Sequence, residues 1–139
     1  MPIVTRHTIA EQKHQKVRIL VAEDNPMNQK LTVTILQKAG YEVDAVENGL
    51  KAIETIKRTS YDLVFMDVQM PEMDGFEATR AIRDFEGTRQ HTTVIAMTAH
   101  VMRGDQERCL EAGMDDYIPK PIQAIDLADV LDRFLSEAD

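Results

Sequence analysis

Short apolar runs alternate with helix-like segments along most of this chain, and this alternation constrains the fold more than any other feature of the sequence. The runs Val17 to Ala22, Leu63 to Met66 and Val94 to Met97 have the length of buried strands. Between them, apolar residues recur at helical spacing. Repeated strand and helix units of this kind form a parallel sheet, and right-handed connections place helices on both of its faces.

Two further strands complete the predicted sheet, at Val43 to Val46 and at Tyr117 to Ile118. Helices are expected from Pro26 to about Ala39, around Ile53, from Phe76 to Ile82, in the segment that ends at Ala112, and from Ile125 to Leu135. Five strands that alternate with five helices predict a flavodoxin-like, doubly wound α/β sandwich with a parallel sheet in the strand order 2-1-3-4-5.

Two of these helices carry apolar residues at helical spacing, which we expect to face the sheet. The first helix has Met27, Leu31, Ile35 and Ala39 with Leu36 beside them, and the last has Ile125, Ala128, Leu131 and Leu135. The single Cys109 is expected in a helix core, and it excludes an internal disulfide.

The 139 residues suit one domain. Residues 1–16 show no sustained periodicity and are predicted to be a linker or a disordered arm, which leaves 17–139 as the folded domain. The formal net charge is −8 and the basic residues are scattered, so we expect no direct nucleic-acid binding and no membrane contact. The apolar runs are too short to cross a bilayer. The single Cys109 suits a reducing cytoplasm, so a cytoplasmic location is expected.

Polar residues follow four of the predicted strands at the point where each strand ends. Glu23 and Asp24 come after the first strand, and Asp67 ends the third. Thr98 and Lys120 follow the fourth and fifth strands. Ligands of open parallel sheets bind at the carboxyl ends of the strands, where the strand order reverses. The five side chains are therefore predicted to line one crevice.

Three carboxylates make this predicted crevice strongly acidic. At a separation of roughly 5 Å, each pair would repel by about 3 kcal/mol at an effective dielectric constant of about 20. An all-oxygen site without sulfur or histidine suits a hard cation, Mg²⁺ or Mn²⁺, better than zinc. Phosphoryl transfer mostly requires positioning and charge neutralisation. Asp67 is the best-placed nucleophile, with Lys120 as a point charge and the Thr98 hydroxyl as a donor to an aspartyl phosphate.

Four motifs surround these positions: Val-Ala-Glu-Asp-Asn, Phe-Met-Asp-Val-Gln-Met-Pro-Glu-Met-Asp-Gly, Met-Thr-Ala and Lys-Pro. From Val17 to about Leu135 the chain resembles the receiver domains of two-component signalling. The resemblance implies an acidic pair at Glu23 and Asp24, a phosphoacceptor at Asp67, a metal-binding backbone carbonyl at Gln69, a switch hydroxyl at Thr98, a switch aromatic at Tyr117 and the family's lysine at Lys120. It also implies a cis peptide bond between Lys120 and Pro121.

The resemblance implies partners as well. A receiver takes its phosphoryl group from a histidine kinase or a histidine phosphotransfer protein and loses it slowly. Phosphorylation remodels the face made by the helix that ends at Ala112, the strand at Tyr117 and the last helix, and this face could also form a homodimer. The motifs are most similar to receivers of hybrid sensor histidine kinases. The chain would then be a stand-alone receiver or an excised piece of a membrane-anchored kinase, and whether it counts as an enzyme stays open.

Two other functions stay open at this point. A haloacid-dehalogenase-like phosphatase also uses an aspartate nucleophile, Mg²⁺, a threonine and a lysine on a similar sheet. Such enzymes place a second aspartate two residues after the nucleophile as a general acid, where this chain has Gln69. An inert flavodoxin-like interaction module would require the acidic crevice to be accidental. Five matching residues at four strand ends favour the receiver function.

Overall fold

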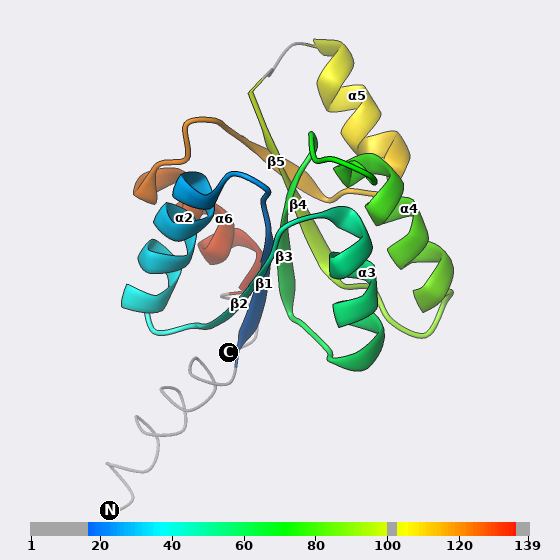
Figure 1. Ribbon diagram of the computed structural model, residues 1–139, viewed down its shortest axis with the longest axis horizontal. Coiled ribbons are helices and arrows are strands. Elements are labelled where there is room, and N and C mark those ends of the chain that lie inside the picture. The colour runs from blue at the N-terminus through cyan, green and yellow to red at the C-terminus, as the bar shows by residue number, and fades with distance from the viewer. Residues whose placement is uncertain (1–16, 100–102, 136–139) are drawn as a thin grey trace, which may run out of the picture.

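Residues 17–99 and 103–135 are described by the computed structural model of this protein. Figure 1 shows a twisted central sheet with helices on both sides. The linker or arm predicted for residues 1–16 lies outside the described residues, so the domain boundary stays a prediction.

Five parallel strands form one sheet in the order β2-β1-β3-β4-β5. The strands are β1 (Arg18–Ala22), β2 (Glu42–Val46), β3 (Leu63–Asp67), β4 (Thr93–Thr98) and β5 (Asp116–Pro119). The helices are α2 (Pro26–Lys38), α3 (Gly49–Arg58), α4 (Gly75–Glu86), α5 (Arg103–Ala112) and α6 (Ala124–Leu135). The predicted doubly wound fold is confirmed, and the strand order reverses between β1 and β3.

Helices α2 and α6 lie together on one face of the sheet, and α3, α4 and α5 cover the other (Figure 1). Successive residues of a strand point to opposite faces. Ile19 and Val21 of β1 therefore belong to the core under α2 and α6, while Leu20 and Ala22 belong to the core under the other three helices. Because both faces are buried, β1 reads as a continuous apolar run instead of an alternating one.

The predicted inner face of α2 is partly wrong. Met27 and Leu31 are 82% and 45% exposed, whereas Thr32 and Leu36 are buried against the sheet. Four residues turn a helix by about 400°, so a strict four-residue row drifts around the helix by about 40° per step. The row that starts at Met27 therefore does not stay on the buried face, and Ala39 at its other end is exposed too.

The stripe predicted for α6 needs the same kind of correction. Leu131 is buried as predicted, but Ile125 is 72% exposed, and the helix buries Leu127 and Val130 instead. Ala128 is exposed as well. Cys109 is buried in α5, as predicted.

Candidate functional site

The five predicted site residues meet at the edge of the sheet where the strands end. Glu23 and Asp24 follow β1, Asp67 is the last residue of β3, and Thr98 is the last residue of β4. Lys120 follows β5. One oxygen atom from each of the three carboxylates lies within 4.8 Å of the other two. The acidic crevice expected from the strand ends is therefore present.

Burial distinguishes the three carboxylates. Glu23 and Asp67 are 1% and 2% exposed, whereas Asp24 is exposed. The Asn25 N–H donates to Oε2 of Glu23 at 3.1 Å, but Oε1 of Glu23 accepts no hydrogen bond from the described residues. An unsatisfied buried oxygen is costly, and a cation bound there would remove the cost. The all-oxygen donor set therefore fits a hard divalent cation.

Lys120 brings a positive charge to the buried carboxylates of this crevice. Its Nζ donates to Oδ2 of Asp67 at 2.8 Å and lies 3.3 Å from Oε1 of Glu23, which is close enough for ion pairing although the geometry is not that of a hydrogen bond. Burial lowers the pKa of Lys120, but the hydrogen bond and the charge of Asp67 outweigh burial and hold that pKa above its ordinary value. The Lys120–Pro121 peptide bond is cis, as expected.

The crevice favours the protonated form of Glu23 in the absence of a cation. Burial, the side chain of Asp67 and its negative charge raise the pKa of Glu23 from 4.5 to about 7, against the opposing effects of the Asn25 N–H and of Lys120. The positive charge of Lys120 thus does not outweigh the effects that raise the pKa of Glu23. A divalent cation would supply the missing charge.

The pH dependence of stability tests this environment. Because the pKa of Glu23 rises from 4.5 to about 7 on folding, protonated Glu23 stabilises the metal-free protein fully below pH 4.5, and this contribution is lost as the pH rises through about 7. We expect the urea midpoint of the unaltered protein, measured in EDTA, to fall relative to that of Glu23→Gln as the pH is raised from about 5 to about 8. Parallel midpoint curves for the two proteins would contradict the raised pKa.

The loop between β3 and α4, residues 68–74, orients Asp67. The Gln69 N–H donates to Oδ1 of Asp67 at 3.0 Å. Helix α4 starts so close to β3 that a Cβ at Gly75 would lie 2.3 Å from the carbonyl oxygen of Asp67, so glycine is required there. The Asp74 side chain accepts from the Glu77 N–H and caps α4. Whether the Gln69 carbonyl binds a cation stays a prediction.

The two predicted switch residues lie on neighbouring strands, Thr98 at the end of β4 and Tyr117 in β5. Thr98 is 3% exposed and lines the same cleft as Asp24 and Gln69. Tyr117 is half-buried and packs against the core under α3, α4 and α5. The Lys120 N–H donates to the carbonyl oxygen of Thr98 at 2.8 Å, which ties the ends of β4 and β5 together. Their switch roles stay predictions.

Several residues of the cleft were not predicted as site residues from the sequence, among them Met70, Phe76 and Arg108. They line a cleft of roughly 610 Å³ that also contains Asp24 and Thr98. The guanidinium carbon of Arg108 lies 4.4 Å from the centre of the Phe76 ring, a cation–π distance. This contact joins α5 to α4. No local motif marks it, because it depends on how the two helices pack.

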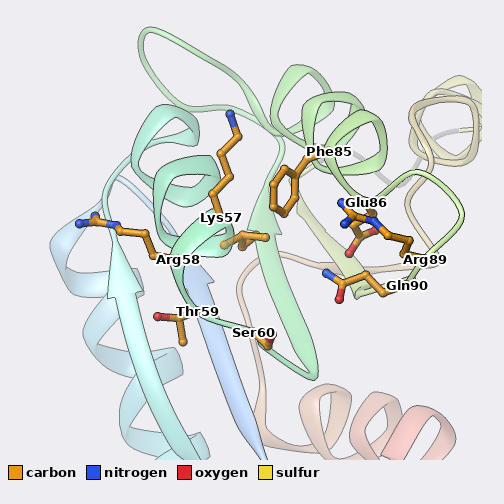
Figure 2. A pocket seen from close by; sticks show the side chains of 9 residues that line it. Lys57, Arg58, Thr59, Ser60, Phe85, Glu86, Arg89 and Gln90 are labelled. Atoms are coloured by element: carbon orange, nitrogen blue, oxygen red, sulfur yellow. The ribbon is translucent and has the colours of Figure 1, made fainter.

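A second cleft lies at the opposite edge of the sheet, between the last turns of α3 and α4 (Figure 2). It measures roughly 260 Å³, and its rim includes Lys57, Phe85 and Arg89. Its acidic residue, Glu86, is buried and accepts hydrogen bonds from Arg83 and from the Thr92 N–H. This cleft therefore lacks the converging carboxylates of the first one.

Comparison with known proteins agrees with this geometry. Residues 19–132 match the family model described as "Response regulator receiver domain". The sensor protein GacS of Pseudomonas syringae pv. syringae is 46% identical over 116 residues, which cover 82% of this chain but 13% of GacS. The chain thus corresponds to a small part of such relatives.

Two solved structures share the fold. The receiver domain of sensor histidine kinase PA1611 from Pseudomonas aeruginosa PAO1, with magnesium in its active site cleft, is 41% identical, with a TM-score of 0.79 over 86% of this chain and 98% of that one. The receiver domain of Ssk1 from Saccharomyces cerevisiae, solved with the histidine phosphotransfer protein Ypd1, is 30% identical, with a TM-score of 0.81 over 88% and 91% of the chains. Among the described residues, no helix is long and apolar enough to span a membrane.

Proposed function

This chain belongs to the response regulator receiver domain family of two-component signalling, and we propose that it accepts a phosphoryl group on Asp67 from a phosphohistidine donor, with Mg²⁺ bound in the acidic crevice. One observation carries the proposal: three carboxylates converge within 4.8 Å while Lys120 Nζ contacts Asp67 at 2.8 Å. A divalent cation would offset the repulsion among the carboxylates, and the lysine supplies a further positive charge.

In the proposed reaction, a carboxylate oxygen of Asp67 attacks the phosphorus of the donor. The bond between phosphorus and the donor nitrogen breaks, and the imidazole leaves with the electron pair. Lys120 and the Thr98 hydroxyl would interact with the transferred phosphoryl oxygens. Mg²⁺ or Mn²⁺, held by Glu23, Asp24, Asp67 and the Gln69 carbonyl, would neutralise the phosphoryl charge and order the reacting oxygens. The product is an aspartyl phosphate on Asp67.

The proposed output is a population shift at the neighbouring face of the fold. An aspartyl phosphate would draw the Thr98 hydroxyl toward it, and Tyr117 would follow, changing the surface of α5, β5 and α6. Leu110 of α5 is 64% exposed, which supports a homodimer through this surface. A cytoplasmic location also belongs to the proposal, since a chain segment with a single cysteine, Cys109, suits a reducing compartment.

Exposed apolar side chains beside the crevice support a protein donor. Met27 lies in the first turn of α2, just after Asp24, and is 82% exposed. Ile125 lies in the first turn of α6, after the loop that contains Lys120, and is 72% exposed. Large apolar side chains at the rim of a charged site are typical of protein docking surfaces. A histidine kinase or a phosphotransfer protein would cover both residues while it presents its phosphohistidine.

Phosphotransfer from a protein donor tests this docking surface. With Mg²⁺ present, radiolabel should pass from a phosphorylated histidine phosphotransfer protein to the unaltered chain. Met27→Glu should slow this transfer by about tenfold, because a charged side chain replaces an apolar contact in the proposed interface. The same variant should react with acetyl phosphate at the unaltered rate, since a small donor needs no docking surface. Equal slowing with both donors would contradict a docking role for Met27.

The two alternative functions have less support than the receiver function. Gln69 stands where a haloacid-dehalogenase-like phosphatase needs its general acid, and its N–H is already bonded to Asp67. An inert interaction module would have no reason to bury Glu23 and Asp67 beside Lys120. Both alternatives also conflict with the receiver-family match over residues 19–132.

A further inference from the structure

Two hydrogen bonds close the loop that carries Gln69 at its base, one to the end of β3 and one across the loop itself. The Gln69 N–H donates to Oδ1 of Asp67 at 3.0 Å, and the Gly75 N–H donates to the carbonyl oxygen of Val68 at 3.1 Å. These contacts fix where the loop leaves the sheet and where α4 begins. They do not reach the outer part of the loop, residues 71–73.

That outer part contacts the loop between β2 and α3. The Nδ2 of Asn48 donates to Oε2 of Glu72 at 3.3 Å. A Cβ at Gly49 would lie 2.5 Å from the carbonyl oxygen of Met73, so the two backbones are in close contact. Glu72 has a φ of 69°, in the left-handed region that non-glycine residues enter only when their surroundings hold them there.

Asn48 uses its two polar atoms for different purposes. Its Oδ1 accepts from the Lys51 N–H at 2.8 Å and caps α3. An aspartate, a serine or a threonine would serve equally well in that role. Its Nδ2 has the second task of binding Glu72, which only a side chain with a donor can perform. Asn48 is 8% exposed, so its amide is held in place by the surrounding structure.

We propose that Asn48 is a positioning residue for the phosphoacceptor site. By holding Glu72, it fixes the loop so that the main chain of Gln69 stays against Asp67. The path of contacts runs from Asn48 to Glu72, along the loop to Gln69, and from Gln69 to Asp67. This inference rests on the proposed function in so far as it predicts Mg²⁺ affinity, because the Gln69 carbonyl is one of the proposed ligands. Asn48 itself touches neither the cation nor the phosphoryl group.

Asn48→Asp separates the two tasks of Asn48. The aspartate keeps the helix cap and suits the positive end of the helix dipole, so α3 should remain as stable as before. It lacks the donor, and its charge repels Glu72. The double variant Asn48→Asp with Glu72→Gln restores the contact with reversed polarity, because the glutamine amide donates to the aspartate. Glu72→Gln alone is the control, since its amide oxygen still accepts from Asn48.

Two readouts are compared for these variants in the full chain. The first is the amide hydrogen-exchange rate of Gln69 in metal-free protein, which reports directly on the Gln69–Asp67 contact. The second is the Mg²⁺ dissociation constant measured by calorimetry. Asn48→Asp should speed the exchange and weaken Mg²⁺ binding by about tenfold, as is typical when a partner of a metal ligand is lost. Both values should return toward those of the unaltered protein in the double variant.

Unchanged Gln69 exchange and unchanged Mg²⁺ affinity in Asn48→Asp would overturn the proposal and leave Asn48 as a helix cap alone. A double variant that behaves like Asn48→Asp would overturn it as well, because the loss would then not come from the contact with Glu72. Failure of the proposed function would look different: the unaltered protein itself would bind no Mg²⁺. The exchange rates of metal-free protein would still decide whether Asn48 positions Gln69.

Discussion

Incubation with Mg²⁺ and acetyl phosphate is expected to add one phosphoryl group to the unaltered chain and none to Asp67→Asn. Asp67 ends β3 inside the crevice, 2% exposed, with Oδ2 at 2.8 Å from Lys120 Nζ. An amide has no negative charge and is a far weaker nucleophile than a carboxylate. The substitution keeps the shape of the side chain and an oxygen that accepts from the Gln69 N–H. We therefore expect Asp67→Asn to lose phosphorylation because it lacks the nucleophile. No adduct should be detected by intact-mass measurement.

Asp84→Asn is a matched control for this experiment. Asp84 is an exposed aspartate in the last turn of α4, away from the carboxyl ends of the strands, so its substitution makes the same change of charge outside the site. It should be phosphorylated at the unaltered rate. The far-ultraviolet circular dichroism of Asp67→Asn should match that of the unaltered chain. A phosphoryl adduct that persists in Asp67→Asn would place the acceptor at another residue.

Asp24→Asn is expected to abolish most of the stabilisation that Mg²⁺ gives to the unaltered chain. Asp24 is the exposed member of the carboxylate cluster, so it lies on the side from which a cation with its waters enters. At about one hundred times its dissociation constant, a ligand raises the free energy of unfolding by about 2.7 kcal/mol. For a domain of this size that corresponds to a rise in Tm of several degrees.

The stabilisation by Mg²⁺ is measured for each protein as the difference between Tm in millimolar Mg²⁺ and Tm in EDTA. Asp24→Asn should show little difference, while Asp84→Asn should respond like the unaltered chain. In EDTA, Asp24→Asn should be at least as stable as the unaltered chain, because it removes a negative charge from the carboxylate cluster. A full Mg²⁺ response in Asp24→Asn would contradict its role as a ligand.

The fold and the converging site residues could be predicted because both follow from strand positions. A buried parallel strand is an apolar run, and the polar residue that follows it must lie at the carboxyl edge of the sheet. This placed Asp67, Thr98 and Lys120 in one crevice before any contact was known. The helical faces were harder to predict, because the apolar row from Met27 drifts around α2. Spacing alone does not distinguish an exposed apolar side chain from a buried one.

The contacts between loops could not be predicted from local patterns. Asn48 precedes Gly49, which locally indicates a turn, and Glu72 lies in a loop with no periodicity. Their hydrogen bond exists only because α3 and α4 pack side by side and bring the two loops together. The stack of Arg108 on Phe76 depends in the same way on the packing of α5 against α4. Both contacts therefore depend on tertiary packing and not on the local sequence.

The most direct test of the central claim is to locate the phosphoryl group. The unaltered chain is phosphorylated with a phosphohistidine protein and Mg²⁺, the acyl phosphate is trapped by borohydride reduction, and the digested peptides are sequenced by tandem mass spectrometry. Phosphorylation of Asp67 predicts that this residue alone is converted to homoserine, and only in samples that contained Mg²⁺. Conversion at a different carboxylate, or an unmodified Asp67 with a phosphorylated histidine elsewhere, would contradict the account.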